Sequence, residues 1–346
     1  MTDWHKPLPE RLPQPSFAPA VMAAGLTCLL WGVVTSWIVS AIGLVATAVA
    51  VALWIGDFGV GQVTAPSATP KAREEPRALT VNRASQVIAT PWLHRSAILL
   101  TVATLLLVVL GAGVTSQAGR PWEVSHLVVG ATVGALTIIL AMLLRNRFGW
   151  TLLAAVLVQA TLGSRDAALA AFHAFLAQMF FAATVAVALV TSNQWKRDPE
   201  FAEDMAKPSL RTLSAIAVGV VVVQVALGAA VRHKMMGAGV HIIGALVVAL
   251  AIVVLGVLVM NQCPSHRTLR PTAIALMVIA ATQVFLGFGA FIVRMMADEN
   301  TLPVVIATMA HVTTGALTLA STLVLTLEIR RNLRPATMEP SDAVQP

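Results

Sequence analysis

Charged side chains are scarce in this 346-residue chain: they make up 11% of its residues, whereas 57% are apolar. A soluble domain of this length needs many more charged residues on its surface. The composition therefore excludes a water-soluble enzyme. The apolar residues form runs of about twenty residues separated by short charged loops, which is typical of a polytopic helical membrane protein.

Signals of several other function classes are also missing. The 23 Lys and Arg residues are scattered through loops and form no basic face interleaved with aromatic residues, so no nucleic-acid partner is expected despite a net charge of +7. No Gly-rich phosphate loop or hydrolase motif is present, which argues against nucleotide-driven chemistry. Cys28 and Cys263 are the only cysteines, and their positions predict no disulfide in the outer loops. Cys263 and His266 supply too few ligands for a metal site.

The chain divides at a segment rich in Pro and charge. Residues 1–58 comprise a polar tail and an apolar run long enough for a transmembrane hairpin with a turn near residues 36–40, a single tilted span being the alternative. Residues 59–92 predict a cytoplasmic linker, and 332–346 a cytoplasmic tail. Eight further apolar segments predict core helices near 93–116, 123–144, 148–164, 167–191, 209–231, 237–260, 271–293 and 303–328.

Lys and Arg are unevenly distributed between the two sides of the predicted membrane. If the N-terminus is cytoplasmic and every span crosses, the inner segments hold 18 of the 23, and the outer loops hold only Arg120, Arg165, Arg232, Lys234 and Arg294. This bias predicts a bacterial-type inner (plasma) membrane protein with both termini in the cytoplasm.

A helix pair repeats four times in the predicted core. Leu-Gly pairs are expected to end the odd helices, at Gly111, Gly163, Gly228 and Gly287, and each following even helix holds one histidine. Because the halves 93–191 and 192–331 each have an even number of spans, they run parallel. The fold class expected is an all-α integral membrane protein, with an eight-helix core of two parallel four-helix repeats plus the N-terminal two-helix hairpin.

The four histidines inside the spans are His126, His173, His241 and His311. Ionisable groups in a membrane are costly and usually functional. The four lie roughly 5 to 13 Å from the outer helix ends at about 1.5 Å per residue. Two neutral imidazoles in each half suit bis-histidine ligation of two hemes. Recurrence in four units disfavours simple packing histidines, and the shortage of carboxylates disfavours a proton relay.

Glu123 is the only carboxylate near these histidines, because Asp57 and Glu328 are expected to cap spans at the cytoplasmic surface. It precedes His126 by three residues, which places both side chains on one helical face. The second half has no equivalent acid, so the halves are expected to differ: one reactive, the other electron-carrying or structural. A glutamate in a first helical turn is also a common dipole-stabilising cap, and both interpretations stand.

These residues resemble the heme A synthase family over about residues 93–331. The resemblance rests on the segment Glu123-Val-Ser-His126-Leu-Val-Val-Gly130, on the Leu-Gly pairs, and on His311 with the small residues after it. Members of that family oxidise the C8 methyl of heme O to the formyl of heme A by successive hydroxylations.

The resemblance implies a set of ligands and partners. Heme O as substrate would lie between His126 and His173 near the outer face, with Glu123 as the catalytic group, either base or charge stabiliser. His241 and His311 would hold a heme b through its iron. Implied partners are heme O synthase, an electron donor, terminal oxidase assembly, membrane lipid and a second copy of the chain.

The chain departs from the family's pattern in three places. Leu127 stands where many relatives have Arg, for which Arg120 or Arg232 are candidate substitutes, and the outer loop after the first core helix lacks the family's cysteine pair. The N-terminal hairpin is additional: a fused small subunit, an anchor for a partner or a lineage-specific extension. Two other functions fit the pattern: a diheme b-type cytochrome that only transfers electrons, and a heme-handling or transport protein without redox turnover.

Overall fold

The computed structural model describes residues 21–22, 25, 37–59, 91–116, 120–163, 166–298 and 301–335. The chain forms two units, residues 1–82 and 83–346, and each is described by itself below.

The first unit contains α2 (Trp37–Gly59), a 23-residue apolar helix that begins inside the turn expected near residues 36–40. Gly25 packs tightly against α2, because a Cβ added there would lie 2.6 Å from Thr47 Oγ1 and 3.1 Å from the Gly43 carbonyl oxygen. The Thr47 hydroxyl donates to that same carbonyl, at 2.8 Å. Most of the expected first arm of the hairpin, and the linker over residues 60–90, lie outside the described residues.

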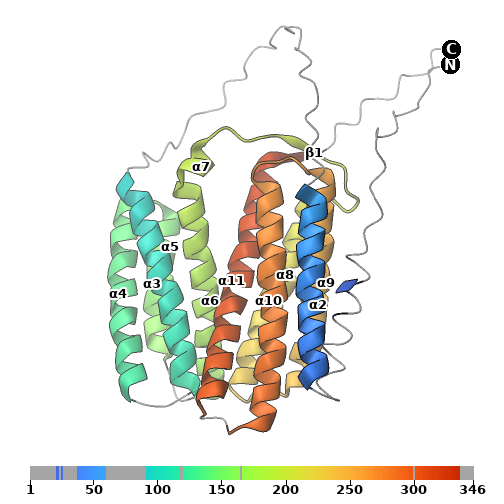
Figure 1. Cartoon of the computed structure of the whole chain (residues 1–346). Coiled ribbons are helices and arrows are strands. Elements are labelled where there is room, and N and C mark those ends of the chain that lie inside the picture. The colour runs from blue at the N-terminus through green and yellow to red at the C-terminus, as the bar shows by residue number, and fades with distance from the viewer. Residues whose placement is uncertain are drawn as a thin grey trace, which may run out of the picture. The chain divides into compact units, whose positions relative to one another are not determined.

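The second unit consists mainly of helices in two neighbouring groups (Figure 1). The long helices are α3 (Pro91–Ser116), α4 (Arg120–Leu144), α5 (Arg147–Leu162), α6 (Ala167–Thr191), α8 (Leu210–Arg232), α9 (Ala238–Gln262), α10 (Leu269–Met296) and α11 (Leu302–Asn332). Their bounds lie within a few residues of the apolar segments in the sequence. That agreement follows from the runs of apolar residues, which fix each helix by composition.

Seven of these helices are long and apolar enough to cross a membrane, all except α5. Large apolar side chains cover their outer faces: Leu127, Leu246 and Leu250 are 70%, 68% and 65% exposed. Such surfaces require an apolar solvent, so the chain is an all-α multi-pass membrane protein. The 16 residues of α5 extend about 24 Å, less than the roughly 30 Å hydrocarbon core.

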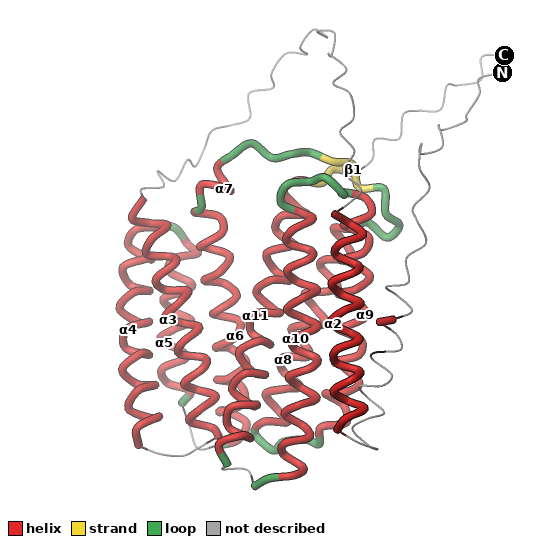
Figure 2. Tube along the Cα trace, viewed as in Figure 1, coloured by secondary structure: helices red, strands yellow, loops and turns green. Residues whose placement is uncertain are grey.

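Helix packing explains the two groups. In the first, α3 packs against α4 and α6, and α5 packs against α4 and α6; in the second, α8 and α10 each pack against α9 and α11. The groups join where α3 and α6 meet α11 and where α6 meets α8 (Figure 2). Phe180 of α6 belongs to the apolar cluster of the first group and Phe181 to that of the second. Helix α6 therefore supports both groups.

The Leu-Gly pairs do not end most of the odd helices, contrary to the expectation from the sequence. Helix α5 does end at Leu162, with Gly163 as its C-cap. Helices α3, α8 and α10 instead continue at least one turn past Gly111, Gly228 and Gly287. Within a membrane a helix keeps its own backbone hydrogen bonds, so glycine interrupts it less readily than in water.

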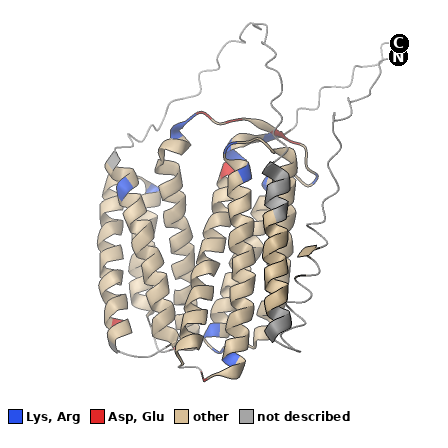
Figure 3. Ribbon diagram, in the orientation of Figure 1, with Lys and Arg blue, Asp and Glu red and all other residues tan. Residues whose placement is uncertain are grey.

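One end of the second unit, here named the sheet end, carries α7 (Asn193–Lys196) and a small parallel sheet. Strand β1 (Ala202–Asp204) pairs with β2 (Leu333–Pro335), with Ala202 opposite Leu333. Most Lys and Arg side chains of the described residues lie at this end (Figure 3). Asn332 and Leu333, at the start of the predicted cytoplasmic tail, are buried.

Glu328 is buried within the sheet end rather than on its surface, with 1% of its side chain exposed. Its Oε2 accepts hydrogen bonds from Thr268 Oγ1 at 3.0 Å and Asn332 Nδ2 at 2.8 Å. The Asn332 Oδ1 in turn accepts the backbone N–H of Glu200 at 3.1 Å. A buried carboxyl group is stable only when its oxygens are hydrogen-bonded, so the expected surface position of Glu328 is wrong. Asn332 joins α11 to the segment after α6.

Replacing Asn332 by Ala should destabilise the sheet end. The change removes a donor from buried Glu328 and the acceptor of the Glu200 N–H, so we expect the free energy of unfolding to fall by about 1–3 kcal/mol. The measurement is the thermal unfolding midpoint of the purified chain in detergent. Asn193→Ala, at an exposed residue with one 3.5 Å contact to Lys196 Nζ, is the control. Equal midpoints for the two variants would contradict the assignment.

Candidate functional site

The four intramembrane histidines meet as two pairs. His126 of α4 and His173 of α6 form the first pair, with ring centres 6.3 Å apart and ring planes at 64°. His241 of α9 and His311 of α11 form the second pair, at 6.2 Å and 89°. Each pair lies within one helix group, toward the end opposite the sheet end. The residues that the sequence assigns to one half are thus brought together in space.

The separation of the ring centres suits one metal ion between two imidazoles. Two metal–nitrogen bonds of about 2 Å, with roughly 1.1 Å from each nitrogen to its ring centre, span about 6.3 Å. The Nδ1 atoms of His126 and His311 are buried and have no hydrogen-bond partner among the described residues. Unpaired buried polar atoms are uncommon in folded proteins, so both pairs have the character of ligand sites.

Three of the histidine rings lie against a glycine of the preceding helix. A Cβ added to Gly111 would lie 3.2 Å from Cε1 of His126; for Gly228 and His241 that distance is 3.0 Å, and for Gly287 and His311 it is 2.7 Å. Nothing lies within 4 Å of a Cβ at Gly163, in the fourth unit. In α3, α8 and α10 the Leu-Gly pair therefore makes room for the imidazole of the next helix.

A glutamine four residues before the glycine contacts the histidine in three units. The Gln159 side chain donates to the His173 carbonyl at 3.1 Å, and His173 Nδ1 lies 3.1 Å from the Gln159 carbonyl. Gln224 Nε2 lies 3.0 Å from His241 Nδ1 and donates to the His241 carbonyl at 2.8 Å.

The third glutamine, Gln283, has its Nε2 3.4 Å from Nε2 of His311. The sequence alone assigns no role to these glutamines. Their recurrence four residues before the glycine is the signal that identifies them as partners of the histidines.

Glu123 lies in the first turn of α4 and is exposed. Leu127, which directly follows His126, is also exposed. Arg232, a candidate replacement for the missing arginine, donates to Ser116 Oγ at 2.6 Å and so links α8 to α3. The Arg120 side chain lies outside the described residues. A carboxylate at this helix end stabilises the helix dipole and is accessible from solution.

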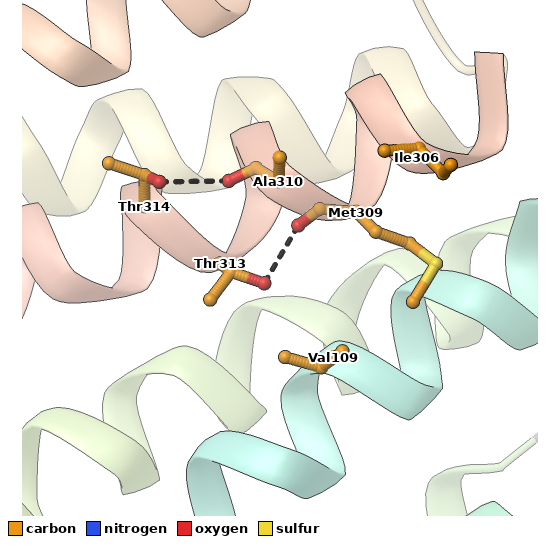
Figure 4. A pocket seen from close by; sticks show the side chains of 6 residues that line it. All are labelled: Val109, Ile306, Met309, Ala310, Thr313 and Thr314. Carbon is orange, nitrogen blue, oxygen red and sulfur yellow. Dashed lines mark hydrogen bonds between the residues drawn. The ribbon is translucent and has the colours of Figure 1, made fainter. Parts of the chain in front are cut away.

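An open apolar pocket of 310 Å³ lies between α3 and α11 (Figure 4). The hydroxyls of Thr313 and Thr314 donate to the carbonyls of Met309 and Ala310, at 2.7 and 2.9 Å. The hydroxyl groups of the pocket lining are therefore already hydrogen-bonded to the backbone of α11. The lining residues are Val109, Ile306, Met309, Ala310, Thr313 and Thr314. The pocket accepts hydrocarbon rather than a polar ligand.

Cys263 and His266 lie at the sheet end and serve the structure there. Burial raises the pKa of the Cys263 thiol, as do the nearby Asp204 and Glu200 carboxylates, so the thiol stays protonated. His266 Nδ1 accepts the backbone N–H groups of Thr268 and Leu269, each at 3.2 Å, and its Nε2 lies 2.8 Å from the Glu200 carbonyl. Both ring nitrogens are thus engaged at the start of α10.

Comparison with known proteins identifies no relative of the chain. No family model, curated protein or solved structure matches it. The function therefore has to be argued from the two histidine pairs and their surroundings.

If the second pair is a heme site, replacing Gly287 by Ala should weaken heme binding there. The new Cβ would lie 2.7 Å from His311 Cε1 and displace the ring, and we expect an affinity loss of about tenfold or more. Titration of the purified chain with heme b, followed by the absorption of bis-histidine heme, measures it. Gly289→Ala on the same helix is the control, since nothing lies within 4 Å of its Cβ. Identical titrations would refute the steric role of Gly287.

Proposed function

We propose that the chain is a heme A synthase that oxidises a methyl group of heme O to a formyl group, for the cofactor of a terminal oxidase. The observation that carries the proposal is the presence of two histidine pairs, each with ring centres 6.2 or 6.3 Å apart, in separate apolar helix groups. The Glu123–His126 motif adds a carboxylate to the first pair only.

The ligand number of each pair favours heme over a simple metal ion. Among the described residues no cluster of three or more His, Cys, Asp or Glu side chains is placed to hold a metal. A structural zinc site needs four protein ligands, whereas in a heme the macrocycle supplies the equatorial nitrogens and the protein adds two axial imidazoles. Apolar helices around the pairs suit the porphyrin faces.

The two pairs have different roles in this proposal. His126 and His173 bind the substrate heme O, and His241 and His311 bind a heme b. When bound, heme b supplies one-electron transfer. Conversion of the methyl to a formyl group adds one oxygen atom and removes protons and electrons. With dioxygen as co-reactant, each hydroxylation consumes two electrons and two protons and releases one water. The first group therefore has to orient the porphyrin edge and exchange protons, and the second has to carry electrons in from the electron donor.

Glu123 is the group that we assign to the reacting methyl. It lies one turn from His126 on the same helix and is exposed, so it can exchange protons with solution. Its carboxylate acts as a base, or stabilises positive charge that develops on the methyl carbon. At the start of α4 the carboxylate also interacts favourably with the helix dipole.

The proposal also includes the finer fold, with α5 as the eighth crossing of two parallel four-helix halves. Packing of α5 against α4 and α6 supports it, and a short helix is accommodated by thinning of the bilayer. The Lys and Arg side chains at the sheet end (Figure 3) support a cytoplasmic sheet end. Both histidine pairs would then lie near the outer face, and Gly25 against α2 supports the N-terminal hairpin.

A diheme b-type cytochrome is the second candidate function. The nearly equal ring separations of the two pairs and the exposed position of Glu123 favour it. In that case both hemes only transfer electrons and Glu123 is a helix cap.

Expression in a membrane that supplies heme O distinguishes the two functions. We expect heme A, or its hydroxymethyl precursor, to appear only when the chain is present. The measurement is acid extraction of the hemes followed by chromatography with mass detection. Recovery of heme b and unchanged heme O alone, with reductant supplied, would exclude the synthase and favour the cytochrome.

Glu123→Ala should lower heme O conversion by about a hundredfold or more, because it removes the proposed base or stabiliser, and should leave heme content unchanged. Asp166→Ala is the matched control. Asp166 caps α6 by accepting the N–H groups of Ala168 and Leu169, each at 3.0 Å, so its loss should cost about 1 kcal/mol of stability and spare conversion. If both variants lose stability alike and convert heme O normally, Glu123 is only a cap.

A further inference from the structure

The four repeat units differ at one position, four residues before the glycine of each odd helix. Three units have glutamine there, Gln159, Gln224 and Gln283, and the first unit has Leu107. Each glutamine places its side-chain amide against a histidine, at 2.8 to 3.4 Å from ring or carbonyl atoms. Leucine has no polar group with which to do so. His126 is therefore the one histidine of the four without an amide partner of this kind.

Leu107 occupies the same place as the glutamines do. Beside the second pair, Gln283 Nε2 is the atom nearest to a Cβ added at Gly315, four residues after His311, at 3.1 Å. Beside the first pair, Leu107 Cδ1 is the atom nearest to a Cβ at Gly130, four residues after His126, at 3.8 Å. The two positions are structurally equivalent, so the difference between them is one of chemistry rather than location.

Hydrogen-bonded neighbours fix the orientation of a metal-binding histidine. Removing such a partner typically weakens metal binding by about 10- to 100-fold. In the second pair both histidines have a glutamine partner. In the first pair only His173 has one, and that glutamine bonds its backbone carbonyl rather than its ring. The buried Nδ1 atoms of His126 and of His311 both have no hydrogen-bond partner among the described residues.

The helix that carries His126 lies at the edge of its helix group. Helix α4 packs mainly against α3 and α5, and its side chains Val124, Leu127 and Val128 are more than half exposed. Helix α6, which carries His173, packs against both groups. A small movement of α4 therefore disturbs fewer contacts than a movement of α6.

We propose that His126 is the exchangeable ligand of the first pair. Heme would be loaded and released there by breaking the iron–His126 bond while the iron–His173 bond stays intact. When that bond breaks, its electron pair returns to the imidazole nitrogen and no electron is transferred. This inference rests on the proposed binding of heme by the histidine pairs. It assigns Leu107 and the three glutamines as positioning residues that set how long each pair retains its heme.

Heme transfer to excess apomyoglobin tests the assignment. The full chain is purified in detergent, loaded with ferric heme b at both pairs, and mixed with apomyoglobin while absorption is followed. We expect two phases, the faster from the first pair. Leu107→Gln should slow the faster phase about tenfold and leave the slower phase unchanged. The reciprocal change, Gln224→Leu, should accelerate the slower phase by a similar factor.

Leu107→Met separates the effect of the amide from the effect of side-chain shape, because it conserves volume without adding a hydrogen bond. Both phases of heme release should then stay as in the parent chain.

Cyanide binding to the ferric protein gives a second readout, because it requires an open axial position, and Leu107→Gln should slow it. If Leu107→Gln and Leu107→Met release heme at the same rate, the inference is wrong although heme binding stands. A chain that binds no heme overturns the proposed function itself.

Discussion

A membrane interior offers no water to polar groups, and this constraint governs most of the structure. Each buried donor or acceptor has to find a partner inside the protein. Threonine hydroxyls meet the requirement locally: Thr104, Thr137 and Thr322 each donate to the carbonyl four residues earlier, at 2.7 Å. The buried carboxyl group of Glu328 meets it through Thr268 and Asn332. Where the requirement is not met, a functional explanation is needed.

Buried polar atoms without a hydrogen-bond partner, among the described residues, gather around the histidine pairs. They include the Nδ1 atoms of His126 and His311 and the Oε1 atoms of the three repeat glutamines, Gln159, Gln224 and Gln283. The buried threonine hydroxyls of the same helices do have partners, so these atoms differ from their polar neighbours. Their repetition at equivalent positions excludes an isolated packing fault and indicates sites that the fold maintains.

The sequence predicts the helices well and some of their contacts poorly, for physical reasons. Long apolar runs determine where a membrane helix begins and ends, and recurrence identified the four histidines. The Leu-Gly pairs misled because glycine ends helices in water, whereas here Gly228 and Gly287 admit a ring from the next helix. Buried Glu328 accepts a hydrogen bond from Thr268, 60 positions away. Pairing of β1 with β2 joins residues more than 100 positions apart, and Arg211 donates to the Leu333 carbonyl of β2 at 2.5 Å. No local pattern encodes such contacts.

The junction between the helix groups brings the surroundings of the two histidine pairs into contact. Gln178 follows His173 on α6, and its Oε1 lies 3.9 Å from a Cβ added at Gly315, where Gln283 of the second pair also lies. Helix α6, which holds His173, thus contacts the surroundings of the second pair. His126, on the peripheral α4, is outside this junction. A movement of α4 would therefore leave the second pair undisturbed, and the proposed exchange at His126 needs this separation.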